Sequence, residues 1–109
     1  MKAIYKEEHS KNIIDLKKNI EYSKDSIVSK VFVKRGDTSV TLFAFDKDQK
    51  IDTHTAPVEA FVQILEGEAQ INISDKDYFV KEGEFILMPS KEPHSLFAVT
   101  QFKMLLFKI

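Results

Sequence analysis

The chain has 109 residues, of which 43% are hydrophobic and 30% are charged, and this composition predicts one compact domain with a single core. Its formal net charge of -1 lacks the strongly basic character of nucleic-acid-binding domains, so no nucleic-acid partner is expected. The absence of cysteine excludes disulfides, thiolate nucleophiles and cysteine-ligated metals.

Residues 1–25 form a polar lead-in that we assign to the same domain as the rest of the chain. Its start, MKAIYKEEHSKN, has no apolar segment typical of a signal peptide or a membrane span, so we expect a cytoplasmic protein without a membrane partner. Ser10 could cap a short helix in which Ile13, Leu16 and Ile20 share one face. The lead-in is therefore predicted to be helical or irregular, and His9 within it is expected to be solvated.

The remaining residues, 26–109, consist of short runs rich in Val, Ile and Phe, separated by turn signals that contain Gly, Asp or Ser. Many short strands at this spacing are typical of an antiparallel sandwich or barrel, so we predict an all-β domain. The predicted strands lie within residues 26–35, 39–46, 59–67, 68–74, 78–83, 84–89, 94–100 and 102–109.

Several of these runs are apolar on both faces. In residues 40–45 Val, Leu and Ala alternate with Thr, Phe and Phe, and in residues 61–65 only one residue, Gln63, is polar. A strand with one face in water normally alternates apolar with polar residues. The second apolar face is therefore predicted to pack on another subunit, which favours a homodimer, or on the N-terminal segment.

The later runs contain glycine, proline and histidine at spacings that resemble the two motifs of the cupins, a family of small jelly-roll β-barrels. The first cupin motif reads G-x5-H-x-H-x3-E-x6-G and the second reads G-x5-P-x-G-x2-H-x3-N. The residues that match are His54 and Gly67 in the first motif, and Gly83, Pro89 and His94 in the second. The resemblance covers roughly residues 36–109 and implies an antiparallel jelly-roll β-barrel.

The departures from these motifs affect function. Asp48 stands at the opening glycine of the first motif, and Lys91 and Ala98 stand at the glycine and the final asparagine of the second. Ala56 stands at the second histidine and Ala60 at the glutamate. In metal-binding cupins these last two positions join the two matching histidines in a site of three His and one Glu. The resemblance therefore implies that half of the metal site is missing.

The two remaining histidines define the candidate site. Under one hypothesis His54 and His94 hold a divalent transition metal such as Fe, Mn, Ni or Zn, because imidazole is a good ligand for these ions. Residues 54, 56 and 60 would share one face of a regular strand, which gives Glu59 and Gln63 the opposite orientation. A β-bulge near Pro57 could turn Glu59 inward as a third ligand, and Gln63 is a weaker candidate.

Without a metal, the same pair could bind an anionic or hydroxylated small molecule, because histidine both donates and accepts hydrogen bonds. Phe97 is the aromatic residue that we expect to line such a pocket, whereas most other phenylalanines fit core or dimer packing. The favoured function is a small-molecule-binding cupin. The alternatives are a metal-dependent enzyme of dioxygenase or isomerase type and an interaction module without pocket chemistry.

Overall fold

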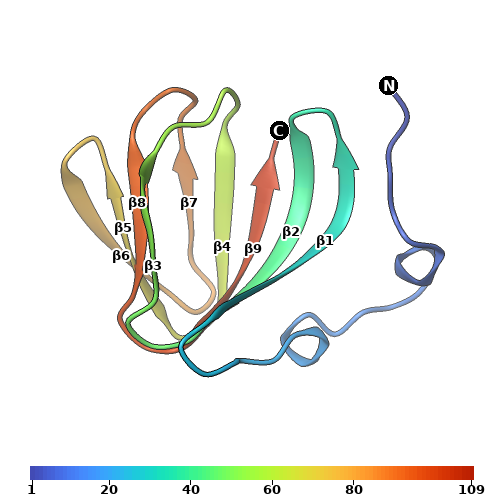
Figure 1. The fold of residues 1–109 in the computed structure, drawn as a ribbon, viewed down its shortest axis with the longest axis horizontal. Coiled ribbons are helices and arrows are strands. Elements are labelled where there is room, and N and C mark those ends of the chain that lie inside the picture. Colours follow the sequence, from blue (N-terminus) through green and yellow to red (C-terminus); the bar gives the residue numbers. More distant parts are fainter.

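The computed structural model describes residues 1–109 and consists of nine antiparallel strands preceded by an irregular segment (Figure 1). Two single-turn 3₁₀ helices, η1 (Glu7–His9) and η2 (Lys17–Asn19), are the only helical elements. The strands are β1 (Ile27–Arg35), β2 (Thr38–Phe45), β3 (Lys50–His54), β4 (Ala60–Glu66), β5 (Glu68–Ile73), β6 (Lys76–Lys81), β7 (Phe85–Met88), β8 (His94–Ala98) and β9 (Phe102–Lys108).

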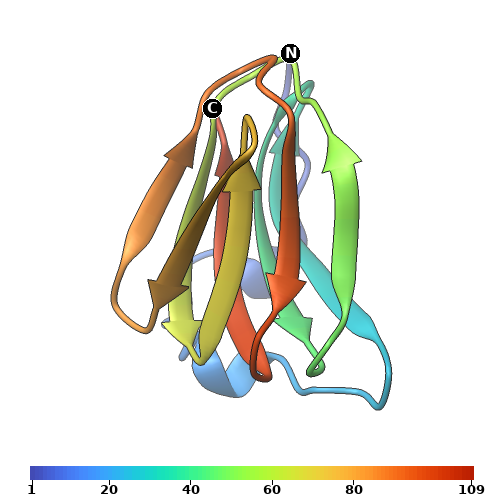
Figure 2. The ribbon, with the colours of Figure 1, turned by 90° about the vertical axis from the view of Figure 1, so that its left-hand side faces the viewer.

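The strands form two sheets that face each other across the core. The five-stranded sheet has the order β1-β2-β9-β4-β7 and the four-stranded sheet the order β3-β8-β5-β6. Figure 2 views the molecule from the side of the four-stranded sheet, with the five-stranded sheet behind it. This arrangement confirms the predicted jelly-roll fold. We call the end with both chain termini and the loops at residues 55–59 and 89–93 the upper end, which is at the top of Figure 1.

Alternation of buried and partly exposed residues along strands such as β4 and β5 builds the core. In β5, Ala69 and Ile71 are fully buried while the residues between them are partly exposed, as expected when one face of a strand meets the core. At the lower end, the rings of Phe45 and Phe102 stack with centroids 4.4 Å apart, and neither has solvent exposure. Burial of such large apolar side chains is the main force that stabilises the fold.

The lead-in differs from the helix predicted around Ser10. Ser10 follows η1 instead of starting a helix, and Ile13 is fully exposed, so it shares no buried face with Leu16 and Ile20. Nucleation of the first turn of a helix costs free energy, so a helix this short needs tertiary contacts along one face to be stable. The contacts that the segment makes are separate, at Ile4, His9 and Ile20, and Ile13 between them is exposed, so two isolated turns form instead.

The end of the lead-in covers the outer face of the five-stranded sheet. Ile20 is buried with Leu42, Ala44 and Leu105, and the Tyr22 hydroxyl donates a hydrogen bond of 2.6 Å to Glu66. Burial, together with this bond to a carboxylate, raises the pKa of Tyr22. Of the two explanations for the second apolar face, the N-terminal segment therefore accounts for β2.

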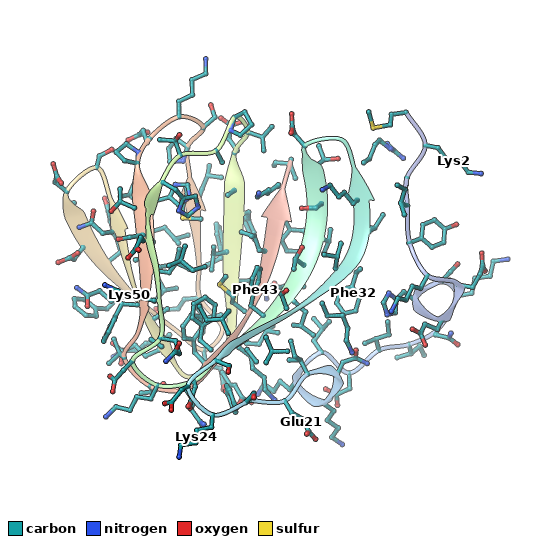
Figure 3. The ribbon with its side chains drawn as sticks, in the orientation of Figure 1. Lys2, Glu21, Lys24, Phe32, Phe43 and Lys50 are labelled. Atoms are coloured by element: carbon teal, nitrogen blue, oxygen red, sulfur yellow. The ribbon has the colours of Figure 1, made fainter.

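His9 is packed, not solvated as the sequence suggested. Its ring meets that of Phe32 edge to face, with centroids 5.0 Å apart. Figure 3 shows Phe32 on the side of β1 that faces the lead-in.

Strand β3 also differs from the sequence prediction, because no predicted run covered it. Ile51 is the only aliphatic residue of β3, so the strand lacks an apolar pattern in the sequence and forms through pairing with β8.

No helix in the structure has the length and hydropathy to span a membrane.

Candidate functional site

His54 and His94 meet at the upper end of the barrel. His54 is the last residue of β3, His94 is the first residue of β8, and the register of these two strands places them opposite each other. Their Nε2 atoms lie 3.1 Å apart, and their ring centroids lie 4.3 Å apart with the planes inclined by 69°. His94 is buried, whereas His54 is exposed, so one imidazole lies inside the barrel and the other at its rim.

Backbone carbonyls fix the orientation of both rings. The Nδ1 atom of His54 lies 2.9 Å from the carbonyl oxygen of Asp52, and that of His94 lies 3.1 Å from the carbonyl oxygen of Glu92. A carbonyl oxygen only accepts hydrogen bonds, so each contact requires a proton on Nδ1. In the neutral rings both Nε2 atoms then carry lone pairs, and the two lone pairs lie on adjacent atoms 3.1 Å apart.

This arrangement leaves the pair one proton short. The two carbonyl contacts and the contact between the rings need three protons, and two neutral imidazoles carry two. Burial lowers the pKa of His94 and nearby positive charge on His54 and Lys108 lowers it further, although the Glu92 carbonyl opposes the shift. His94 therefore favours the neutral form, in which its Nε2 atom presents an acceptor to any donor that enters.

The histidines line a small cavity between the sheets. The cavity has a volume of about 50 Å³ and most of its lining residues are apolar. They are Phe43, Ile51, His54, Ala56, Ala60, Met88, His94, Leu96, Met104, Leu106 and Lys108. In such surroundings the two imidazoles and one ammonium supply the polar groups that would select and orient a ligand.

The loops at the upper end hold the site in place. The backbone N–H of Lys91 donates a hydrogen bond of 2.8 Å to the carbonyl of Ala56, which ties the loop before His94 to the loop after His54.

Lys91 and Asp48, two residues without glycine's freedom, adopt the left-handed backbone conformation. Lys91 has a φ of +68°, and Asp48, in the loop between β2 and β3, has a φ of +70°. These are the two positions where the cupin motifs have glycine and this chain does not. The left-handed backbone conformation, which glycine adopts most easily, is thus kept without glycine.

The structure does not bring the other sequence candidates to the cavity. Glu59 is exposed, and its carboxylate accepts a hydrogen bond of 3.3 Å from the Ser90 N–H. A hydrogen bond from its own backbone N–H, followed by those from Ser90, lowers the pKa of Glu59. The loop at residues 55–59 is neither strand nor bulge, so nothing turns Glu59 inward. Gln63 pairs with Phe85 and is absent from the cavity wall.

Phe97 also lies away from the cavity. It is three residues from His94 on the same strand, so alternation places it on the opposite face, where it is exposed. Phe43 is the aromatic residue that lines the cavity instead. Sequence reasoning also missed Lys108, Met88 and Met104. The signal for them was the alternation of inward and outward residues along their strands. This alternation identifies cavity residues only once the pairing of the strands is known.

The donor set does not fit a metal held by protein ligands. Two Nε2 atoms 3.1 Å apart could both reach one ion, because zinc–imidazole bonds are about 2.1 Å long. However, no group of three or more His, Cys, Asp or Glu side chains is placed to hold an ion. The methyl groups of Ala56 and Ala60 line the cavity where further ligands would be needed, and Lys108 adds a positive charge.

The fold agrees with comparisons to known proteins. The cupin domain family profile matches residues 41–108. The chain belongs to the cupin family. A crystal structure of SPY1581, a protein of unknown function from Streptococcus pyogenes, is 39% identical to this cupin, with a TM-score of 0.88. The match covers 91% of this chain and 87% of that chain.

Two further structures share the cupin fold. A cupin 2 conserved barrel domain protein from Leptotrichia buccalis is 34% identical, with a TM-score of 0.85, and the match covers 88% of this chain and 47% of that chain. A salicylate 1,2-dioxygenase from Pseudaminobacter salicylatoxidans is 20% identical, with a TM-score of 0.69, over 75% of this chain and 26% of that chain. At this identity the likeness concerns the fold alone. No curated protein matches this cupin.

Proposed function

We propose that this cupin binds a small hydroxylated or anionic molecule in the barrel cavity, with His54 and His94 as the groups that recognise it. The observation that carries the proposal is the convergence of the two Nε2 atoms, 3.1 Å apart, in a cavity whose other lining residues are mostly apolar. Polar atoms that converge in an apolar pocket fix the orientation of a ligand and provide its specificity.

The proton count supports a donor on the ligand. With both Nδ1 atoms bonded to carbonyls, each Nε2 accepts a hydrogen bond, so a hydroxyl group that lies against the pair supplies the missing proton. Lys108 lines the same cavity and takes part in none of the ion pairs of the structure. Its ammonium group would attract a negatively charged part of the same molecule.

Saturable binding at the histidines tests the proposal. A panel of small alcohols, hydroxy acids and carboxylates is titrated into the protein, and the histidine ring nitrogens are followed by two-dimensional NMR. We expect saturable shifts at His54 and His94 in the wild type, and also at the cavity residues Ala56 and Ala60, whose shifts should be lost in a folded double variant, His54→Ala/His94→Ala. His9→Gln is the matched control because His9 contacts Phe32 outside the barrel. An interaction module would bind its partner equally well in both variants.

Metal-dependent chemistry is the alternative that this proposal replaces. The aligned Nε2 atoms favour it, whereas the absence of a third ligand opposes it. Elemental analysis of the protein purified without chelator distinguishes the two functions. We expect no stoichiometric metal after incubation with iron, manganese, nickel or zinc. Near-stoichiometric metal that is lost in the His54→Ala/His94→Ala variant would contradict a metal-free pocket.

We also propose that this cupin forms a homodimer through the outer face of β4, β7 and β9. Phe61 stacks on Phe85 with centroids 4.4 Å apart and meets Phe107 at 5.6 Å, and Phe107 borders the cluster that contains Ile20 of the lead-in. Phe85 and Leu87 are 60% and 47% exposed on an edge strand, where a second chain could pack. Light scattering should give twice the chain mass for the wild type and less for Phe85→Ser; a monomeric wild type would exclude the dimer.

A further inference from the structure

A groove at the upper end continues the histidine cavity across β1 and β2. It has a volume of about 300 Å³ and shares Phe43, Leu106 and Lys108 with the cavity wall. The four-stranded sheet ends at β3, while the five-stranded sheet extends to β1 (Figure 1). The inner face of β1 and β2 is therefore open to solvent at this end of the barrel.

The register of the sheet places two lysines in one row along this groove. Lys34 on β1 pairs with Ser39 on β2, and Ser39 pairs with Lys108 on β9. Paired residues point to the same face, and neighbouring strands lie about 4.8 Å apart, so the two lysines begin about 10 Å apart on either side of Ser39. Long flexible side chains at this separation can both reach one anion.

Neither lysine is neutralised by a partner. No ion pair of the structure includes Lys34 or Lys108. Asp37, at the turn between β1 and β2, is the one acidic residue that lines the groove, so the groove keeps an excess positive charge. The two like charges lie two strands apart on the same face and repel each other, and a bound anion would remove this cost.

The hydroxyl groups in the groove are also unpaired. Ser29, Ser39 and Thr41 line it, and the hydroxyl-bearing side chains that form hydrogen bonds lie elsewhere in the protein. Thr41 is 7% exposed as a residue, and its hydroxyl oxygen remains accessible from the groove, because the one buried side-chain polar atom without a partner is Nδ1 of His9. A row of free hydroxyl groups beside the apolar surfaces of Phe43 and Leu106 suits a molecule with several hydroxyl groups on a carbon chain.

We propose that the cavity and the groove together bind a polyhydroxylated carboxylate, with its carboxylate between Lys34 and Lys108 and a hydroxyl group at the far end on the histidine pair. This inference rests on the proposed function of the cavity and adds the class of ligand. The hydroxyl groups between the two ends contact Ser39 and Thr41, and the carbon chain lies along Phe43 and Leu106.

The test uses two probes with the same six-carbon chain, gluconate with a carboxylate and sorbitol without one. Their dissociation constants are measured by NMR titration of the wild type, and the affected residues are mapped. A hydrogen bond to a charged group contributes roughly 1.5–3 kcal/mol, so we expect gluconate to bind at least about tenfold more tightly than sorbitol. Both probes should shift the resonances of His54 and His94.

Three variants assign the effect to the groove. Lys34→Gln should weaken gluconate binding by about tenfold without changing sorbitol binding, and Lys34→Arg should restore most of it. Thr41→Val should weaken both probes. Lys47→Gln is the matched control, because Lys47 is exposed at the opposite end of the barrel and should leave both constants unchanged. Circular dichroism confirms that each variant is folded.

The outcomes separate this inference from the function on which it rests. If both probes shift the histidines equally and Lys34→Gln changes neither, the carboxylate site is wrong and the cavity proposal stands. If gluconate shifts only the groove residues, the groove binds an anion but the histidine pair is not part of the site. If neither probe gives a saturable shift at tens of millimolar, the assigned ligand class is overturned.

Discussion

The two ends of the barrel differ in how completely their groups are satisfied. At the lower end, Phe45 and Phe102 stack without solvent exposure, and apolar side chains fill the space between the sheets. At the upper end, the histidine pair is one proton short, and Lys34 and Lys108 have no ion-pair partner. The comparison shows that one scaffold can concentrate its stabilising packing at one end while polar groups at the other end remain without protein partners.

Replacement of the lower aromatic stack should have the largest effect on stability. Phe102→Ala removes a fully buried ring and leaves a cavity against Phe45, so we expect a loss of about 3–5 kcal/mol in the free energy of unfolding. Urea denaturation measures it. Phe79→Ala is the control, because Phe79 is 56% exposed and should cost well under 1 kcal/mol, about 0.5 at most. Equal losses would show that the lower end does not dominate the stability.

The turn between β4 and β5 at the lower end should tolerate substitution poorly. A Cβ at Gly67 would lie 2.1 Å from the Gln101 carbonyl oxygen, whereas a Cβ at Gly83 would meet no atom within 4 Å. Both glycines have a positive φ, so each alanine variant loses about 1–2 kcal/mol from the backbone conformation alone. Thermal denaturation should show Gly67→Ala to be less stable than Gly83→Ala; a reversed order would contradict the close packing of this turn.

Acidification should weaken the upper end. The pKa of His94 is below its ordinary value of about 6.5, so the unfolded chain binds more protons than the folded chain in the window below that value. The free energy of unfolding should therefore fall as the pH drops from about 7 through this window. Urea denaturation at a series of pH values, compared with His94→Gln, measures the contribution. An identical pH dependence in the variant would rule out His94 as its source.

The smallest expected effect is a gain of stability at the upper end. Lys91 has a φ of +68°, a conformation that costs a non-glycine residue about 1–2 kcal/mol, part of which is offset by the greater freedom of glycine in the unfolded chain. We expect Lys91→Gly to raise the free energy of unfolding by about 0.5–1 kcal/mol. The backbone bond to Ala56 is retained in this variant. A lower melting temperature would show that the lysine side chain stabilises the loop.

The sequence by itself determined the jelly-roll fold and most of the strands, and it singled out the two histidines as site candidates. Alternation of apolar residues and turn signals depend only on neighbours in the chain, and the spacing of Gly83, Pro89 and His94 is a local pattern. These features can be recognised without knowledge of which strands pair. Strand β3 could not be predicted in this way, because its residues are mostly polar and it depends on β8 for its hydrogen bonds.

Only the tertiary structure decided the composition of the site. The proximity of His54 to His94, and the row of Lys34, Ser39 and Lys108, arise from the register between strands that are distant in sequence. Register depends on the packing of whole sheets, so no local pattern reveals it. The same packing placed Glu59 outside the cavity and covered β2 with the lead-in.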